Sequence, residues 1–155
     1  MSCRFTNNLH NTIEKRLSDS FNPFTVDFCD TVSLDGCLGT LRECSVSVAT
    51  RVFKGWVNGW ATSDRYKNVE VKVLPCLLGC TNCKDSLAHY LICPHLFALW
   101  KFFVEDTSND PLSRWGLSFP SKLKCNTIAC IFSAYHAVRN DLKASAFFIP
   151  CLLYT

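Results

Sequence analysis

The sequence predicts a mainly α-helical fold, a small helical domain that carries a zinc knuckle and at most a short strand or hairpin. Apolar residues recur at intervals of three and four along three long stretches, which is the spacing of amphipathic helices. Between these stretches, cysteines and histidines cluster from residue 76 to residue 95. At 155 residues the chain is long enough to bury a core, so a metal would add to that core rather than replace it.

Three segments are expected along the chain. Residues 1–40 form a weakly ordered N-terminal segment, because Asp35-Gly36 and Gly39-Thr40 are typical of turns and no clear apolar period precedes them. Residues 41–146 form the helical zinc-binding domain. Residues 147–155 form an apolar tail, far shorter than the roughly 18 apolar residues that a membrane-spanning helix needs.

The first helix of the domain is expected to run from Leu41 to about Trp60, with Gly59 as a candidate terminator. Tryptophan side chains can stack on nucleic-acid bases. The position of Trp56 and Trp60 on the apolar face nevertheless favours a place in the core. The apolar stripe of this helix consists of Leu41, Cys44, Val48, Val52, Trp56 and Trp60.

A short strand and a second helix are predicted further along the chain. Val69–Leu74 alternates apolar and charged residues, which is the period of a half-buried strand. A helix begins at Pro94 and ends near Glu105. A polar loop over residues 106–121 follows, and three of its side chains are expected to return to the core. These are Leu112, Trp115 and Leu117.

The last helix is predicted over about Ser121–Ala146. Arg139, Lys143 and His136 are expected on or beside its polar face, and His136 as a surface or packed histidine rather than a ligand. Cys125 and Cys130 are expected to be structural. The apolar stripe consists of Ile128, Ile131, Phe132, Tyr135, Val138 and Leu142.

The cysteine content indicates a reducing compartment. The chain has 11 cysteines, an odd number that does not fit a framework of paired disulfides. Its first residues are polar and lack the apolar core of a signal peptide, so we expect reduced thiols and a nuclear or cytoplasmic location. In that setting clustered cysteines favour a metal site.

One stretch contains the residues of a structural zinc site, which needs four nitrogen or sulfur ligands at tetrahedral corners. Cys76 and Cys80 form one candidate pair, and Cys80 and Cys83 form another, because C-x2-C is the commonest zinc-turn spacing. Either pair is completed by His89 and Cys93, which are four residues apart and share one face of a short helix. The residues alone leave open whether Cys76 or Cys83 is the fourth ligand.

The motifs around this stretch resemble a known family. They are similar to the zinc-binding segment that follows the reverse transcriptase domain in non-LTR (LINE-type) retrotransposon polyproteins. The similar stretches are Leu74-Pro75-Cys76, Lys84 to Pro94 and Leu99-Trp100, with Trp56 to Tyr66 upstream. Only residues 56–100 carry specific motifs of this family. Aligning its acidic residue and its histidine makes Cys76 and Cys80 the cysteine pair. The family usually spaces this pair by two residues rather than three, which keeps Cys83 as the alternative ligand.

The resemblance implies binding of RNA or DNA through contacts to the nucleic-acid backbone. The net charge is only +3, but residues 40–101 contain eight Lys and Arg against four Asp and Glu, so this segment carries the whole excess. The expected phosphate contacts within it are Arg65, Lys67, Lys72 and Lys84.

No catalytic motif accompanies the zinc stretch. The sequence has no Asp-Asp pair for two polymerase metals, no P-loop, no dinucleotide fingerprint and no G-x-S-x-G elbow. We therefore expect no enzymatic activity, no small-molecule substrate and no membrane association. Two alternatives to nucleic-acid binding stay open: a non-functional remnant of a retroelement, and a protein–protein interaction domain that uses the apolar tail.

Overall fold

The protein is mainly α-helical, as the sequence predicts. The computed structural model describes residues 33–66, 73–104, 108 and 110–152, with Asn11, Thr12, Lys15 and Asp19, and describes side chains as far as Leu142. Its main helices are α3 (Leu34–Arg42), α4 (Val46–Trp56), α5 (Leu87–Ile92), α6 (Pro94–Val104), α7 (Pro111–Arg114) and α8 (Lys122–Leu152). In this part of the chain, no helix is both long and apolar enough to cross a membrane.

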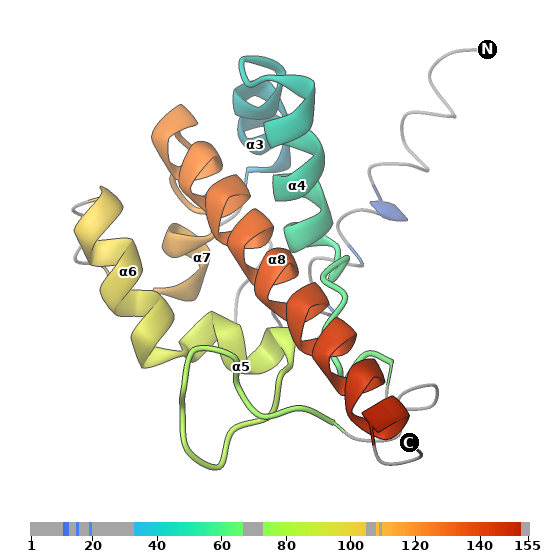
Figure 1. Cartoon of the computed structure of the whole chain (residues 1–155). Helices are drawn as coiled ribbons and strands as arrows, with labels where there is room; N and C mark the ends of the chain where they lie inside the picture. Colours follow the sequence, from blue (N-terminus) through green and yellow to red (C-terminus); the bar gives the residue numbers. More distant parts are fainter. Residues whose placement is uncertain are drawn as a thin grey trace.

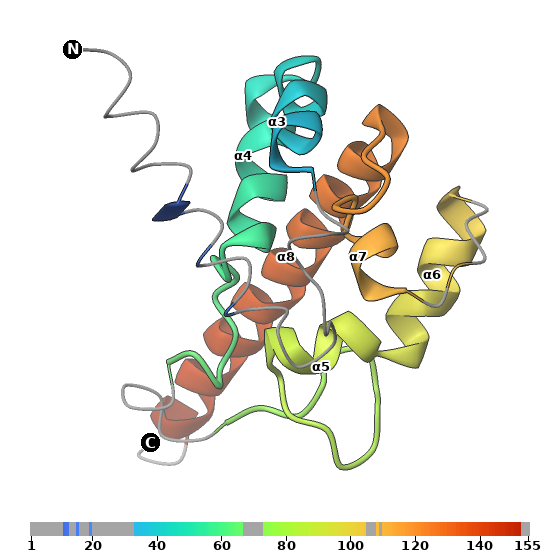
Figure 2. The same ribbon diagram turned by 180° about the vertical axis from the view of Figure 1, so that it is seen from behind.

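The long helix α8 organises the molecule. It runs across the whole structure, with α3 and α4 on one side and α5 and α6 on the other (Figures 1 and 2). Helix α4 packs most extensively against it, and α6 and α3 also contact it. The core therefore lies along α8 rather than between two separate layers of helices.

The predicted helix from Leu41 to Trp60 is correct only in part, because the structure divides this stretch between α3 and α4. Ser45 has an extended backbone and its side chain accepts from the amide of Val48, so it caps a new helix. The predicted turns at residues 35–36 and 39–40 are also wrong, since both lie inside α3. That helix is capped by Ser33 and buries Leu34, Cys37 and Leu41 on one face.

Helix α4 ends in a left-handed turn at Asn58, where φ is 53°. The amide of Asn58 donates to the carbonyl of Gly55 and the amide of Gly59 donates to that of Lys54, which is a Schellman ending. The predicted terminator Gly59 is thus one residue beyond the left-handed position. It is needed for another reason, because a Cβ there would lie 2.7 Å from the Lys54 carbonyl oxygen.

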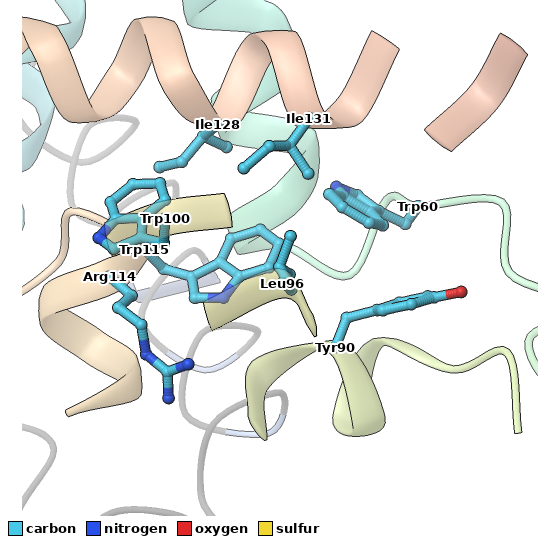
Figure 3. Close-up of a pocket in the computed structure, with 8 residues that line it drawn as sticks. All are labelled: Trp60, Tyr90, Leu96, Trp100, Arg114, Trp115, Ile128 and Ile131. Carbon is cyan, nitrogen blue, oxygen red and sulfur yellow. The ribbon is translucent and has the colours of Figure 1, made fainter. Parts of the chain in front are cut away.

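Aromatic side chains fill the centre of the core. Trp56 and Trp60 are buried, as predicted, and the indole N–H of Trp56 donates to the carbonyl of Trp115 at 2.8 Å. Trp60 stacks on Tyr135 with ring centroids 4.9 Å apart. Figure 3 shows Trp60 and Tyr90 beside a small cavity of about 20 Å³ that Trp100 and Trp115 also line. The ring centroids of Trp60 and Trp115 are 5.3 Å apart.

The loop after α6 returns to the core as predicted, since Leu112, Trp115 and Leu117 are all buried. It also contains the short helix α7, which the sequence reading missed. Asp110 caps α7 and Pro111 occupies its first position, both of which are ordinary helix-start signals.

The predicted orientation of α8 is only partly correct. Ile128 and Tyr135 are buried, but Val138 and Leu142, predicted to be apolar core residues, are nearly half exposed. Arg139 was predicted on or beside the polar face and is instead 2% exposed, so the buried face turns away from the predicted stripe at the C-terminal end. Residues 147–152 continue the helix.

Other expectations for α8 and its surroundings have mixed outcomes. Cys125 is buried as expected of a structural cysteine, whereas Cys130 is exposed. His136 packs its ring on Phe132, with centroids 4.2 Å apart, and burial lowers its pKa. Most of the predicted strand Val69–Leu74 lies outside the described residues, and the pairing described next to it is one antiparallel bridge between Pro75 and Lys84.

A methyl group added at Gly55 in α4 and at Gly39 in α3 should have opposite effects on stability. A Cβ at Gly55 would lie 2.7 Å from the Trp115 ring, whereas one at Gly39 would meet nothing within 4 Å. Alanine in a helix interior is favoured over glycine by about 1 kcal/mol, so Gly39→Ala should raise the free energy of unfolding by about 0.5–1 kcal/mol. Gly55→Ala should lower it by about 1–3 kcal/mol, because the buried indole has to shift.

Urea denaturation followed by far-UV circular dichroism measures both variants. Stabilisation of similar size in the two proteins would contradict the close packing of Trp115 on α4.

Candidate metal centre

A hairpin-like loop over residues 75–84, the metal loop, positions the first two candidate ligands. The amide of Cys76 donates to the carbonyl of Cys83 at 2.8 Å, and the amide of Asp85 donates to that of Leu74 at 2.9 Å. Between these two ends the chain turns tightly at Gly79, whose φ is +88° and whose amide donates to the carbonyl of Cys76. Glycine adopts this left-handed conformation without steric cost, so the turn can bring Cys80 back toward Cys76.

The short helix α5 positions the other two candidates. Ser86 is its N-cap, and its hydroxyl accepts from the amide of His89 at 3.2 Å. Cys93 ends the helix, four residues after His89, so their side chains share one face as predicted.

Four side chains converge where the loop meets this helix. One ligand atom from each of Cys76, Cys80, His89 and Cys93 lies within 4.8 Å of all the others. The sulfurs of Cys80 and Cys93 are 3.5 Å apart, close to the roughly 3.8 Å that two thiolates have on a tetrahedral ion with metal–sulfur bonds of about 2.3 Å. The four residues can therefore hold a metal ion.

Cys83, the alternative ligand, does not belong to this group in the described residues. Its backbone carbonyl accepts a hydrogen bond from the amide of Cys76. Of the two ligand sets that the sequence left open, the structure therefore brings together the set with Cys76.

Burial shapes the chemistry of this group of four side chains. Cys76 and Cys93 are buried, and the Nε2 atom of His89 is buried with no protein hydrogen-bond partner in the described structure. Burial lowers the pKa of His89. Burial also raises the pKa of the Cys80 thiol to about 12, with a further rise from the Cys93 and Cys76 thiols beside it. A divalent cation would oppose the shift at Cys80, because it binds the thiolate, and would suit the neutral imidazole that burial favours at His89.

The sequence did not predict the role of Asp85, which lies within the motif Lys84 to Pro94. Its side chain is fully buried and accepts from the Ser63 amide, the Tyr90 hydroxyl and the Tyr135 hydroxyl. Arg139 lies 3.7 Å away. Arg139 and Tyr135 are four residues apart on an otherwise apolar face, and that arginine was the available signal that a buried carboxylate would face α8.

The predicted phosphate contacts have different outcomes. Arg65 and Lys84 are exposed, and they lie on adjacent segments because the amide of Asp64 donates to the carbonyl of Asp85 at 3.1 Å. The guanidinium of Arg65 is 5.8 Å from the centre of the Tyr66 ring, and Tyr66 is 40% exposed. Lys67 and Lys72 lie outside the described residues.

Comparison with family models, with curated proteins and with solved structures gave no match for this chain. The resemblance to the retrotransposon segment therefore rests on the motif residues alone. The geometry of the Cys and His cluster stands independently of it.

Substitution of a single sulfur should separate the two ligand sets. Cys93→Ser removes a buried member of the cluster and should abolish stable metal binding, whereas Cys83→Ser should leave one bound ion per chain. Titration with Co²⁺, followed by its visible tetrahedral absorption and by metal analysis after gel filtration, distinguishes the variants. Loss of binding in Cys83→Ser but not in Cys76→Ser would show that Cys83 is the ligand.

Metal affinity should fall as the pH falls. The Cys80 thiol, with a pKa of about 12, has to lose its proton to bind metal, so at every pH below this value protons compete with the ion. This thiol alone should weaken binding about tenfold for each unit of pH lost. Competition against a chromophoric chelator between about pH 6 and pH 8 measures the slope, and a flat profile would exclude thiolate ligation by Cys80.

Proposed function

We propose that this chain is a zinc-stabilised nucleic-acid-binding module without catalytic residues of its own. The observation that carries the proposal is the convergence of Cys76, Cys80, His89 and Cys93 within 4.8 Å, beside two exposed cations. Zinc would hold the loop and α5 together, and the adjoining surface would contact RNA or DNA.

The donor set supports zinc. Three sulfurs and one imidazole nitrogen suit a soft or borderline ion, whereas Mg²⁺ and Ca²⁺ take oxygen ligands. Four protein ligands complete a tetrahedron and leave no open position for water, which is the arrangement of structural rather than catalytic zinc. This closed coordination supports a binding module rather than an enzyme, and no small-molecule substrate is proposed.

The surface next to the cluster supports nucleic acid as the partner. Arg65 and Lys84 are exposed on segments joined by a backbone hydrogen bond, and the sequence between Arg65 and the metal loop adds Lys67 and Lys72. Such cations bind phosphates with little regard to sequence. The exposed ring of Tyr66 adds an aromatic surface of the kind on which bases stack.

The thiol ligands support a cellular location for the protein, and the motif residues support an origin. Free thiolate ligands persist in a reducing compartment, which supports a nuclear or cytoplasmic protein. The motif residues support descent from the segment that follows the polymerase in a retroelement. A non-functional remnant would keep the metal-binding geometry but bind no nucleic acid.

A protein–protein interaction domain is the second candidate, and one observation favours it. Helix α6 exposes Leu99, Phe102 and Phe103, and a hollow of about 300 Å³ with apolar walls lies between this helix and α8. Large apolar patches of this kind mark contact surfaces. The tail predicted as a contact lies beyond the described side chains.

Nucleic-acid binding should depend on the two cations beside the metal loop. The double variant Arg65→Ala/Lys84→Ala should weaken binding about tenfold or more, and should reduce the slope of log affinity against log salt by about 1.4 to 1.8, because two phosphate contacts are lost. Fluorescence anisotropy with a labelled single strand and a labelled duplex, at several salt concentrations, provides both numbers.

Arg42→Ala is the matched control, since Arg42 is an exposed cation at the end of α3. It should leave the salt slope unchanged. Equal losses in the control and in the double variant would mean that general charge rather than this surface attracts the nucleic acid. No binding by the metal-loaded wild type would favour the remnant.

A further inference from the structure

The Asp85 carboxylate is fixed between the metal loop and helix α5. Asp85 directly follows Lys84, which forms the bridge with Pro75, and directly precedes Ser86, the cap of α5. Its amide donates to the carbonyl of Leu74, and its carbonyl accepts from the amide of Asp64. Both the backbone and the side chain of Asp85 are therefore anchored, so its carboxylate can act as a rigid point of attachment.

Three segments that are distant in sequence supply the donors to this carboxylate. Oδ2 accepts from the Ser63 amide at 2.7 Å, and Oδ1 accepts from the hydroxyls of Tyr90 and Tyr135, each at 2.8 Å. Arg139 on α8 supplies the positive charge at 3.7 Å. A buried carboxylate requires this set, because each missing donor leaves a desolvated charge without compensation.

The Tyr90 hydroxyl connects this network to the loop and to the helix that carry the candidate metal ligands. It donates to Asp85 and accepts from the amide of Leu77 at 3.2 Å, the residue after Cys76. Tyr90 itself follows His89 on α5, and the two rings lie 5.6 Å apart. One hydroxyl thus fixes the loop that carries Cys76 against the helix that carries His89.

We infer that Asp85 is a positioning residue of the metal centre, and that helix α8, through Tyr135 and Arg139, sets its metal affinity. The inference rests on the metal binding proposed above and adds a dependence on a helix that contributes no ligand. Hydrogen-bonded groups behind metal ligands typically change affinity by 10- to 100-fold. Because Asp85 acts through Tyr90 and the backbone, we expect the lower end of that range.

The test compares two hydroxyl deletions on α8. Tyr135→Phe keeps the ring and removes the two contacts with Asp85, and should weaken zinc binding about tenfold. Thr127→Val is the matched control, because the Thr127 side chain is also buried on α8 and its hydroxyl donates only locally, to the carbonyl of Leu123. It should bind zinc with wild-type affinity, even if its melting temperature changes.

Zinc affinity is measured by competition with a chromophoric chelator at a temperature where circular dichroism shows each variant folded. The rise in melting temperature on adding zinc provides a second readout, and should be smaller in Tyr135→Phe than in Thr127→Val. A loss of stability alone would move the metal-free melting temperature but not the affinity of the folded protein.

The outcomes separate this inference from the proposed function. Equal affinities in the wild type, Tyr135→Phe and Thr127→Val would overturn the role of α8 and leave zinc binding intact. A wild-type chain that binds no zinc would overturn both. Should Tyr135→Phe fail to fold, Arg139→Lys, which keeps the charge and shortens the reach toward Asp85, replaces it with the same expected direction, and an unchanged affinity there overturns the inference.

Discussion

The buried carboxylate of Asp85 is the interaction on which the arrangement of the other elements depends. An ionised group removed from water is stable only when donors replace the water that it loses. Ser63, Tyr90, Tyr135 and Arg139 supply that replacement from the loop after α4, from α5 and from α8. A single charge therefore requires three distant segments to meet at one point. This requirement holds Asp85, which directly follows the loop, against the long helix.

Helix α5 connects that carboxylate to the four candidate metal ligands. It has six residues, well below the length at which an isolated helix persists in water, so its stability has to come from its ends and its buried face. Ser86 caps its start, Tyr90 joins it to Asp85, and His89 and Cys93 face the metal loop. Burial raises the pKa of the Cys80 thiol, and a cation would bind this group as the thiolate. Metal binding would therefore add to the stability that the cap and the buried face of this helix already provide.

Two surfaces of different chemistry flank the four candidate ligands, and each surface suits a different class of partner. Arg65 and Lys84 lie beside the metal loop, where a phosphate backbone could follow the positive charge. The exposed phenylalanines of α6 lie on the other side of the cluster along the chain, and offer apolar area with no charge. Positive charge suits a nucleic acid as the partner, and apolar area suits a protein.

Local spacing within the sequence determined the helical class, the burial of Trp56 and Trp60, and the shared face of His89 and Cys93. Each of these depends on residues within a few turns of one another, where helix geometry leaves little choice. Tertiary structure alone decided the break at Ser45, across which the apolar period of Leu41 and Cys44 continues without interruption. It also turned Arg139 into the core, and it grouped Cys76, which the family resemblance had favoured over Cys83, with the other ligands. The burial of Arg139 depends on Asp85 meeting a helix whose tyrosine lies 50 residues away. Local patterns cannot encode such a pairing, because an arginine on a helix is stable in solvent until a buried carboxylate makes the interior the better place for it.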